Sequence, residues 1–116
     1  MTSIAVQESS LSIRDEGKQF ITIKSNHLKK ASMIIRALNH GLRQKIVRLV
    51  EEHGRLTVTE IYVKLRLEQS VASQQLAILR NAGILITERE GKYIYYSVNV
   101  PRIKNIQSFI DDIINF

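Results

Sequence analysis

Apolar residues recur at intervals of three and four residues in five segments of the chain, which is the spacing of one face of a helix. These segments predict helices over about residues 26–38, 42–53, 57–65, 69–82 and 99–113. Residues that favour helix ends bracket several of them, because Asn26 precedes the first, and Gly54 and Gly83 follow the second and the fourth. The pattern therefore predicts a mainly helical chain.

Between the last two predicted helices the period changes to two. Apolar and polar residues alternate on both sides of Glu90-Gly91, which supplies a tight turn. The alternating apolar residues are Ile84, Ile86, Ile94, Tyr96 and Val98. This alternation predicts a β-hairpin with one buried face.

The third and fourth helices are joined by a short connection at residues 66–68. The third opens with Thr57 and Glu60, which have the spacing of a capping box, in which each residue satisfies a free backbone amide of the other. Two helices joined by a short turn and followed by a hairpin predict a winged helix-turn-helix. The expected fold class is therefore α+β, mainly α with a β-hairpin wing.

The N-terminal segment carries a weaker pattern. Residues 1–17 are rich in Ser, contain scattered apolar residues and end at Gly17. They predict a loosely ordered lead-in to one domain over residues 18–116. The apolar residues 20–23 fit either a short strand or a helix start, because so short a run does not define its own period.

The fourth helix separates two kinds of side chain. A helical projection puts Ala72, Gln75, Leu76 and Leu79 on one side and Ser70, Ser73, Gln74, Ala77 and Arg80 on the other. The second side offers hydrogen-bond donors and acceptors without a negative charge, and Gln can contact a base edge in a bidentate manner. The plain alternative is a polar surface without a ligand.

Charge favours a polyanionic partner. The chain has 17 Lys and Arg against 11 Asp and Glu, a net charge of +6 and a pI near 9.8. Charge alone also allows an anionic membrane surface. Arg89 and Lys92, however, flank the turn of the predicted hairpin, where they can reach a phosphate or a minor groove.

Several classes of protein are disfavoured. The chain has no Cys, which excludes disulfides, thiolate metal sites and thiol switches. The polar N-terminus does not resemble a signal peptide, and no apolar run approaches the roughly 20 residues that cross a bilayer, so we expect a cytoplasmic protein. We find no catalytic constellation and no phosphate-binding Gly-rich loop, and we expect neither enzymatic activity nor a cofactor.

Linked motifs extend from Leu38 to Val98. They are Ala37-Leu38 with Arg43 and Ile46, then residues 57–61, 69–76 and 79–85, and finally 89–92 with Tyr95-Tyr96. Together they resemble the ArsR/SmtB family of bacterial transcriptional repressors. His40-Gly41 stands where that family usually has Asp-Pro.

The resemblance implies a dimer in which the fourth helix of each subunit enters a major groove of a palindromic operator. The implied contacts to double-stranded DNA come from Val58, Gln69, Ser70, Ser73 and Gln74, with Arg89 and Lys92 on the backbone. Arg66 and Glu68 depart from the family's usual turn residues. Glu68 must therefore point away from DNA or help to shape specificity.

The resemblance also implies a homodimer formed through the first and last helices. The implied interface residues are Leu28, Ala31, Ile35, Leu38, Ile103, Ile106, Phe109, Ile110, Ile113 and Phe116. The alternative for each is the core of its own chain. The last helix favours an interface because it is apolar yet lies outside the motifs.

The metal sites of many family members are not reproduced. Residues 57–59 contain no thiol, and Asp111-Asp112 in the last helix has no neighbouring histidine. The histidines lie far apart in the sequence, at His27, His40 and His53. We therefore expect no metal site, structural or surface roles for the histidines, and an effector that the sequence leaves unidentified.

The sequence leaves three candidate functions for this protein. The leading one is a sequence-specific, dimeric DNA-binding repressor. The second is a winged-helix module whose Ser and Gln face meets another protein. The third, an enzyme, would need a deep pocket lined by titratable groups.

Overall fold

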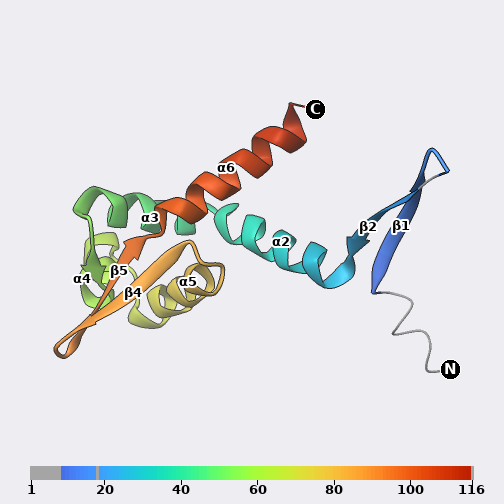
Figure 1. Ribbon diagram of the computed structural model, residues 1–116. Helices are drawn as coiled ribbons and strands as arrows, with labels where there is room; N and C mark the ends of the chain where they lie inside the picture. Colours follow the sequence, from blue (N-terminus) through green and yellow to red (C-terminus); the bar gives the residue numbers. More distant parts are fainter. Residues whose placement is uncertain (1–8, 18, 116) are drawn as a thin grey trace, which may run out of the picture. The chain divides into compact units, whose positions relative to one another are not determined.

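The computed structural model describes residues 9–17 and 19–115. The chain divides into two compact units, residues 1–33 and residues 34–116 (Figure 1). Within the described residues, no helix is both long enough and apolar enough to cross a membrane.

The first unit holds an antiparallel hairpin and the start of a helix. Strand β1 (Ser10–Asp15) pairs with β2 (Gln19–Lys24) in a register that runs from Ser10 opposite Lys24 to Asp15 opposite Gln19. Helix α2 (Ser25–Leu38) follows β2 without a linker, and the Ser25 amide donates to the Ser9 carbonyl at 2.8 Å. The helix begins in the first unit and ends in the second.

The hairpin corrects one expectation and settles another. Residues 10–15 form a strand, although residues 1–17 were expected to be loosely ordered; residues 1–8 lie outside the described part of the chain. Leu11 and Ile13 alternate with serines, and Gly17, at φ 77°, lets the chain reverse. The sequence allowed residues 20–23 to be either a short strand or the start of a helix. In the structure they lie in β2.

The second unit has the expected order of elements. After the end of α2 come α3 (Gly41–His53), β3 (Leu56–Thr57), α4 (Val58–Leu65), α5 (Gln69–Asn81), β4 (Leu85–Glu90), β5 (Tyr93–Val98) and α6 (Val100–Ile114). The helix-turn-helix formed by α4 and α5 and the wing formed by β4 and β5 confirm the predicted fold class. Strand β3, which was not predicted, pairs with β5 and completes a sheet in the order β3-β5-β4.

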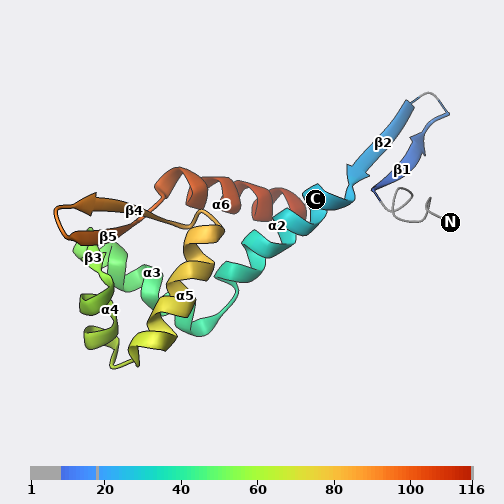
Figure 2. The same cartoon turned by 90° about the horizontal axis from the view of Figure 1, so that it is seen from below.

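One core holds the second unit together. Its fully buried large side chains are Ile46, Val50, Ile61, Leu76, Leu79, Ile84 and Leu85. They come from α3, α4, α5 and the entry to the wing, and burial of each stabilises the fold by about 1.5–3 kcal/mol. The core therefore fixes α5 relative to α4 and the wing, whereas α6 starts at the base of the wing and runs away from α4 (Figure 2).

Candidate nucleic-acid interface

Helix α5 buries one side and exposes the other, as its sequence predicted. The buried residues are Ala72, Leu76 and Leu79. The exposed residues include Gln69, Ser70, Ser73 and Gln74. None of these four side chains forms a hydrogen bond with the described residues, so their amides and hydroxyls are available to a ligand.

The N-terminus of α5 is also uncapped by a side chain. Glu68 occupies the N-cap position in an extended conformation, with φ −71° and ψ 147°, and makes no side-chain hydrogen bond to the helix. The first-turn amides carry the positive end of the helix dipole, which favours a phosphate there. The Glu68 carboxylate opposes that preference, as its place in the sequence suggested.

Helix α4 begins with the predicted capping box. The Glu60 amide donates to Thr57 Oγ1 at 3.2 Å, and the Thr57 amide donates to Glu60 Oε1 at 2.9 Å. The hydrogen bond from the Thr57 amide lowers the pKa of Glu60 below its ordinary value. The capping box therefore keeps the Glu60 carboxylate hydrogen-bonded at the start of the helix.

An open hollow joins the start of α4 to the wing. It is lined by Thr57, Val58, Thr59, Glu60, Lys92, Tyr93, Ile94 and Tyr95. The structure thus brings Val58 and Lys92, which lie far apart in the sequence, to the same hollow. Threonine hydroxyls, a lysine and tyrosines in an open groove are suited to contacts with a sugar-phosphate backbone.

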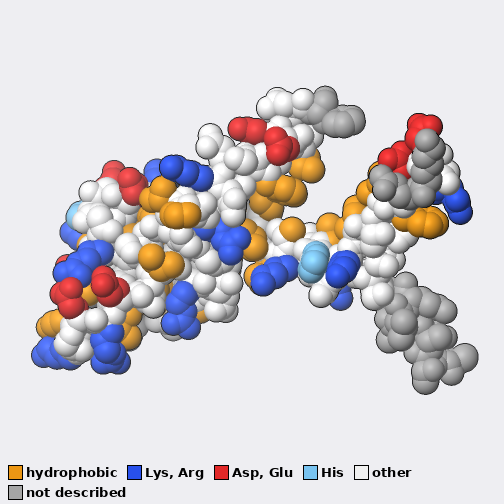
Figure 3. All heavy atoms as spheres, viewed as in Figure 1, with side chains coloured by type: hydrophobic (Ala, Val, Ile, Leu, Met, Phe, Trp, Pro, Cys, Tyr) orange, Lys and Arg blue, Asp and Glu red, His pale blue; other side chains and the backbone are white. Residues whose placement is uncertain are grey.

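The wing carries exposed cations. Arg89 and Lys92 are both exposed, and basic side chains gather at the end of the wing (Figure 3). Glu88 and Glu90 would offset their charge. One of these acids is already paired, because Arg55 binds Glu90 through two hydrogen bonds of 2.9 and 3.1 Å.

Arg55 is a residue that the sequence did not single out. Its guanidinium also stacks on the Tyr95 ring, with Cζ 4.0 Å from the ring centroid. The side-chain hydrogen bonds between the two groups, and then their opposite charges, raise the pKa of Arg55 and lower the pKa of Glu90. Because Arg55 lies in the loop before β3, this pair attaches that loop to the far end of β4.

Arg43 connects α5 to the rest of the second unit. It is only 8% exposed, and its guanidinium donates to the Ala37 carbonyl at 2.6 Å, the Arg36 carbonyl at 3.2 Å and Gln75 Oε1 at 2.8 Å. One side chain of α3 therefore holds the end of α2 and the buried side of α5.

The geometry is that of known transcriptional regulators. Residues 40–87 match the model of the family described as bacterial regulatory protein, arsR family. The transcriptional repressor PagR of Bacillus anthracis is 35% identical over 86 residues, which are 74% of this chain and 86% of that protein. The chain belongs to the arsR family. Members of this family bind DNA and regulate transcription, and they are not enzymes.

Solved structures support the same conclusion. The crystal structure of PagR is 33% identical to this chain, covers 75% of it and 99% of PagR, and has a TM-score of 0.60. HlyU from Vibrio cholerae is 26% identical, covers 77% of this chain and 96% of HlyU, and has a TM-score of 0.59. These similarities confirm the winged helix-turn-helix predicted from the sequence.

The start of α3 is capped by a histidine. His40 is the N-cap of α3, and its Nδ1 accepts from the Arg43 amide at 3.4 Å. His53 Nδ1 lies 3.0 Å from the Leu49 carbonyl oxygen. Both contacts are local, and within the described residues no three His, Asp or Glu side chains cluster so as to hold a metal ion.

The residues expected at a dimer interface differ in exposure. Leu28, Phe109 and Ile113 are 57%, 47% and 62% exposed. The partly buried ones are Ala31, Ile35, Leu38, Ile103 and Ile110. Ile106 is 5% exposed and packs in the core of its own chain, and Phe116 lies outside the described residues.

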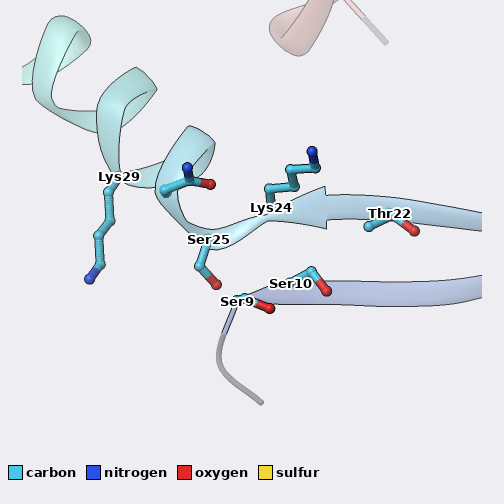
Figure 4. A pocket seen from close by; sticks show the side chains of 7 residues that line it. Ser9, Ser10, Thr22, Lys24, Ser25 and Lys29 are labelled. Atoms are coloured by element: carbon cyan, nitrogen blue, oxygen red, sulfur yellow. The ribbon is translucent and has the colours of Figure 1, made fainter. Parts of the chain in front are cut away.

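A polar hollow in the first unit lies outside the residues matched by the arsR-family model. It is lined by Ser9, Ser10, Thr22, Lys24, Ser25, Asn26 and Lys29. The side chains of Lys24 and Lys29 point away from one another (Figure 4). The two cations therefore do not converge on a common ligand.

Proposed function

We propose that this arsR-family chain is a dimeric repressor that reads an inverted-repeat operator through α5 and blocks transcription by occupying promoter DNA. The observation that carries the proposal is the exposed face of α5, where Gln69, Ser70, Ser73 and Gln74 have no partner among the described residues. Small hydroxyl residues allow the helix backbone to approach a groove wall, and glutamines can contact base edges.

Contacts outside α5 would position the protein on the duplex. Val58 and Lys92 line one hollow, and Arg89 is exposed beside it on the wing. Arg55 neutralises Glu90, so the cations at the end of the wing face less local repulsion of phosphate. These residues would supply sequence-independent affinity, whereas α5 would supply specificity.

The dimer would form through α2 and α6. Ile35, Leu38 and Ile110 line a shallow apolar hollow between these helices, and Phe109 and Ile113 lie exposed on α6. Two α5 helices related by a twofold axis would read half-sites about one helical turn apart. The sequence has no cysteine and no histidine in α6, so we propose that the metal-sensing chemistry of some relatives is missing and that any effector is of another kind.

Selection from randomised duplex DNA tests this function. We expect an inverted repeat to be enriched, and we expect Ser73→Ala with Gln74→Ala to remove the preference for it. Gln107→Ala with Ser108→Ala is the matched control, because both residues are exposed on α6. If the selection yields no preferred sequence, the Ser and Gln face serves a protein partner instead.

A further inference from the structure

The N-terminal hairpin has one apolar face and one polar face. The register pairs Leu11 with Ile23 and Ile13 with Ile21, and alternation along a strand puts these four side chains on the same face. On the other face, Ser12 and Thr22 hydrogen-bond through their hydroxyls at 3.0 Å, and Arg14 lies over the Phe20 ring. The hairpin therefore has the amphipathic pattern of a layer whose apolar face packs against another surface.

Nothing in the first unit covers the apolar face. Leu11, Ile13, Ile21 and Ile23 are 56%, 54%, 55% and 45% exposed, and none of the described side chains up to Met33 is buried. An isolated two-stranded hairpin is at best marginally stable in water. Four half-exposed Leu and Ile side chains present about 400 Å² of apolar surface, which is the size of a functional patch on a soluble protein.

We infer that this face packs against a second copy of the chain, as an arm of the dimer proposed above. A standard interface buries about 800 Å² on each partner, and the hairpin face would supply about half of that area. Exposed apolar side chains of α2 and α6 can supply the rest; they are Leu28, Met33, Phe109, Ile113 and Ile114.

Chain connectivity supports the same partner. Helix α2 follows β2 without a linker, and the hydrogen bond from Ser25 to Ser9 closes the open end of the hairpin onto the first turn of the helix. The hairpin face is thus continuous along the chain with a helix proposed for dimerisation. The face also lies outside residues 40–87, so the family's helix-turn-helix does not account for it.

Charge disfavours an anionic membrane as the partner. Residues 10–24 carry Arg14, Lys18 and Lys24 against Asp15 and Glu16, a net charge of only +1. Peripheral membrane segments instead combine an apolar face with an excess of Lys and Arg. A hairpin with so small an excess of cations and an aliphatic face is suited to another protein surface.

The test introduces one charge on each face of β1 in the full-length protein. Ile13→Glu places a carboxylate on the apolar face, and Ser10→Glu, the matched control, places one on the polar face opposite Lys24. In sedimentation equilibrium we expect Ile13→Glu to raise the dimer dissociation constant about 100-fold, because a symmetric dimer loses the buried side chain twice. We expect the control to change it less than about threefold.

A milder variant separates loss of the dimer contact from unfolding of the hairpin. Ile13→Thr keeps a β-branched residue that favours a strand, and we expect a rise of about tenfold in the dissociation constant. Far-UV circular dichroism at low temperature should show an unchanged helix content in all three variants. Equal dissociation constants for Ile13→Glu and Ser10→Glu would overturn the inference.

Other outcomes separate this inference from the proposed function on which it rests. If Ile13→Glu leaves dimerisation intact while operator binding persists, the arm is wrong and the operator-reading dimer stands. If Ile13→Glu weakens the dimer but the wild-type protein selects no DNA sequence, the arm stands and the proposed function fails. A monomeric wild-type protein, or binding to anionic vesicles that Ile13→Glu abolishes without changing the dimer, overturns the arm.

Discussion

Arg43 Nη1 donates a hydrogen bond of 2.8 Å to Gln75 Oε1, which ties the start of α3 to the buried side of the proposed DNA-reading helix. The same guanidinium donates to the last turn of α2 through the carbonyls of Ala37 and Arg36. Because a guanidinium stays charged, its burial requires these acceptors. The position of α5 is therefore coupled to the end of a helix proposed for dimerisation.

Removing this guanidinium should destabilise the protein strongly. Arg43→Met keeps much of the side-chain length but leaves Gln75 and two carbonyls without their donor, so we expect a loss of about 2–4 kcal/mol in the free energy of unfolding. Urea denaturation followed by circular dichroism measures it. In a double-mutant cycle, Gln75→Leu should cost less in the Arg43→Met background than in the wild type; additive losses would show that the two side chains are not coupled.

The capping box should contribute both stability and a pH dependence. Thr57→Ala removes the acceptor for the Glu60 amide and should cost about 1 kcal/mol. The lowered pKa of Glu60 stabilises the fold above the carboxyl's unfolded pKa, and this contribution is lost as the pH falls through the folded pKa. Urea denaturation at neutral and acidic pH should therefore show a smaller acid-induced loss in Glu60→Gln than in the wild type.

Gly83 should tolerate substitution less well than Gly41. Gly83 has φ 75°, and a Cβ there would lie 3.0 Å from Arg102 Nε, so Gly83→Ala should cost about 1–2 kcal/mol. Gly41 starts α3 with nothing within 4 Å of an added Cβ, so we expect Gly41→Ala to be neutral or stabilising by up to about 1 kcal/mol. Thermal denaturation compares the two, and equal melting temperatures would contradict the expected strain at Gly83.

The wing lysine should contribute to affinity but not to sequence preference. Lys92→Gln should weaken binding to all duplexes alike and reduce the slope of log affinity against log salt by about 1. Lys104→Gln, on the exposed surface of α6, is the control and should leave the slope unchanged. Fluorescence anisotropy over a salt series measures both. A change in the preferred sequence would instead place Lys92 at a base edge.

Arg55 should control the ionisation of Glu90. We expect Arg55→Gln to return the pKa of the Glu90 carboxyl toward its ordinary value, because the two hydrogen bonds and the neighbouring charge are lost. Carboxyl chemical shifts followed by NMR over a pH titration report this change. Both side chains are exposed, so the effect on stability should be small. A Glu90 titration that is the same in both proteins would contradict the pairing.

The sequence predicted those parts of the fold that repeat a pattern over many residues. The helices that bury Ile46, Leu76 and Leu79 and the two strands of the wing were expected. The buried face predicted for the wing was wrong in part, because Ile86 and Ile94 are 48% and 43% exposed. The two faces of α5 were also correct, because a helix of 13 residues leaves little freedom in the direction of its side chains.

The parts that were missed depend on contacts remote in sequence or on very short elements. Strand β3 has two residues and exists only because Leu56 and Thr57 pair with β5. Arg55 meets Glu90 across 35 residues, and no local motif marks that contact. Strand β1 could have been found from the alternation of Leu11 and Ile13 with serines, but its serine content suggested a loop.

The missing side-chain cap at Glu68 bears on how this protein could be engineered. Replacing Glu68 with Ser would be expected to stabilise α5 by about 1 kcal/mol, a gain that the natural chain forgoes. The same serine hydroxyl would occupy an amide that can otherwise meet a phosphate. Removing the Glu68 carboxylate would at the same time lift the repulsion of a phosphate at this helix start, so a substitution that stabilises α5 would also change its contacts with DNA.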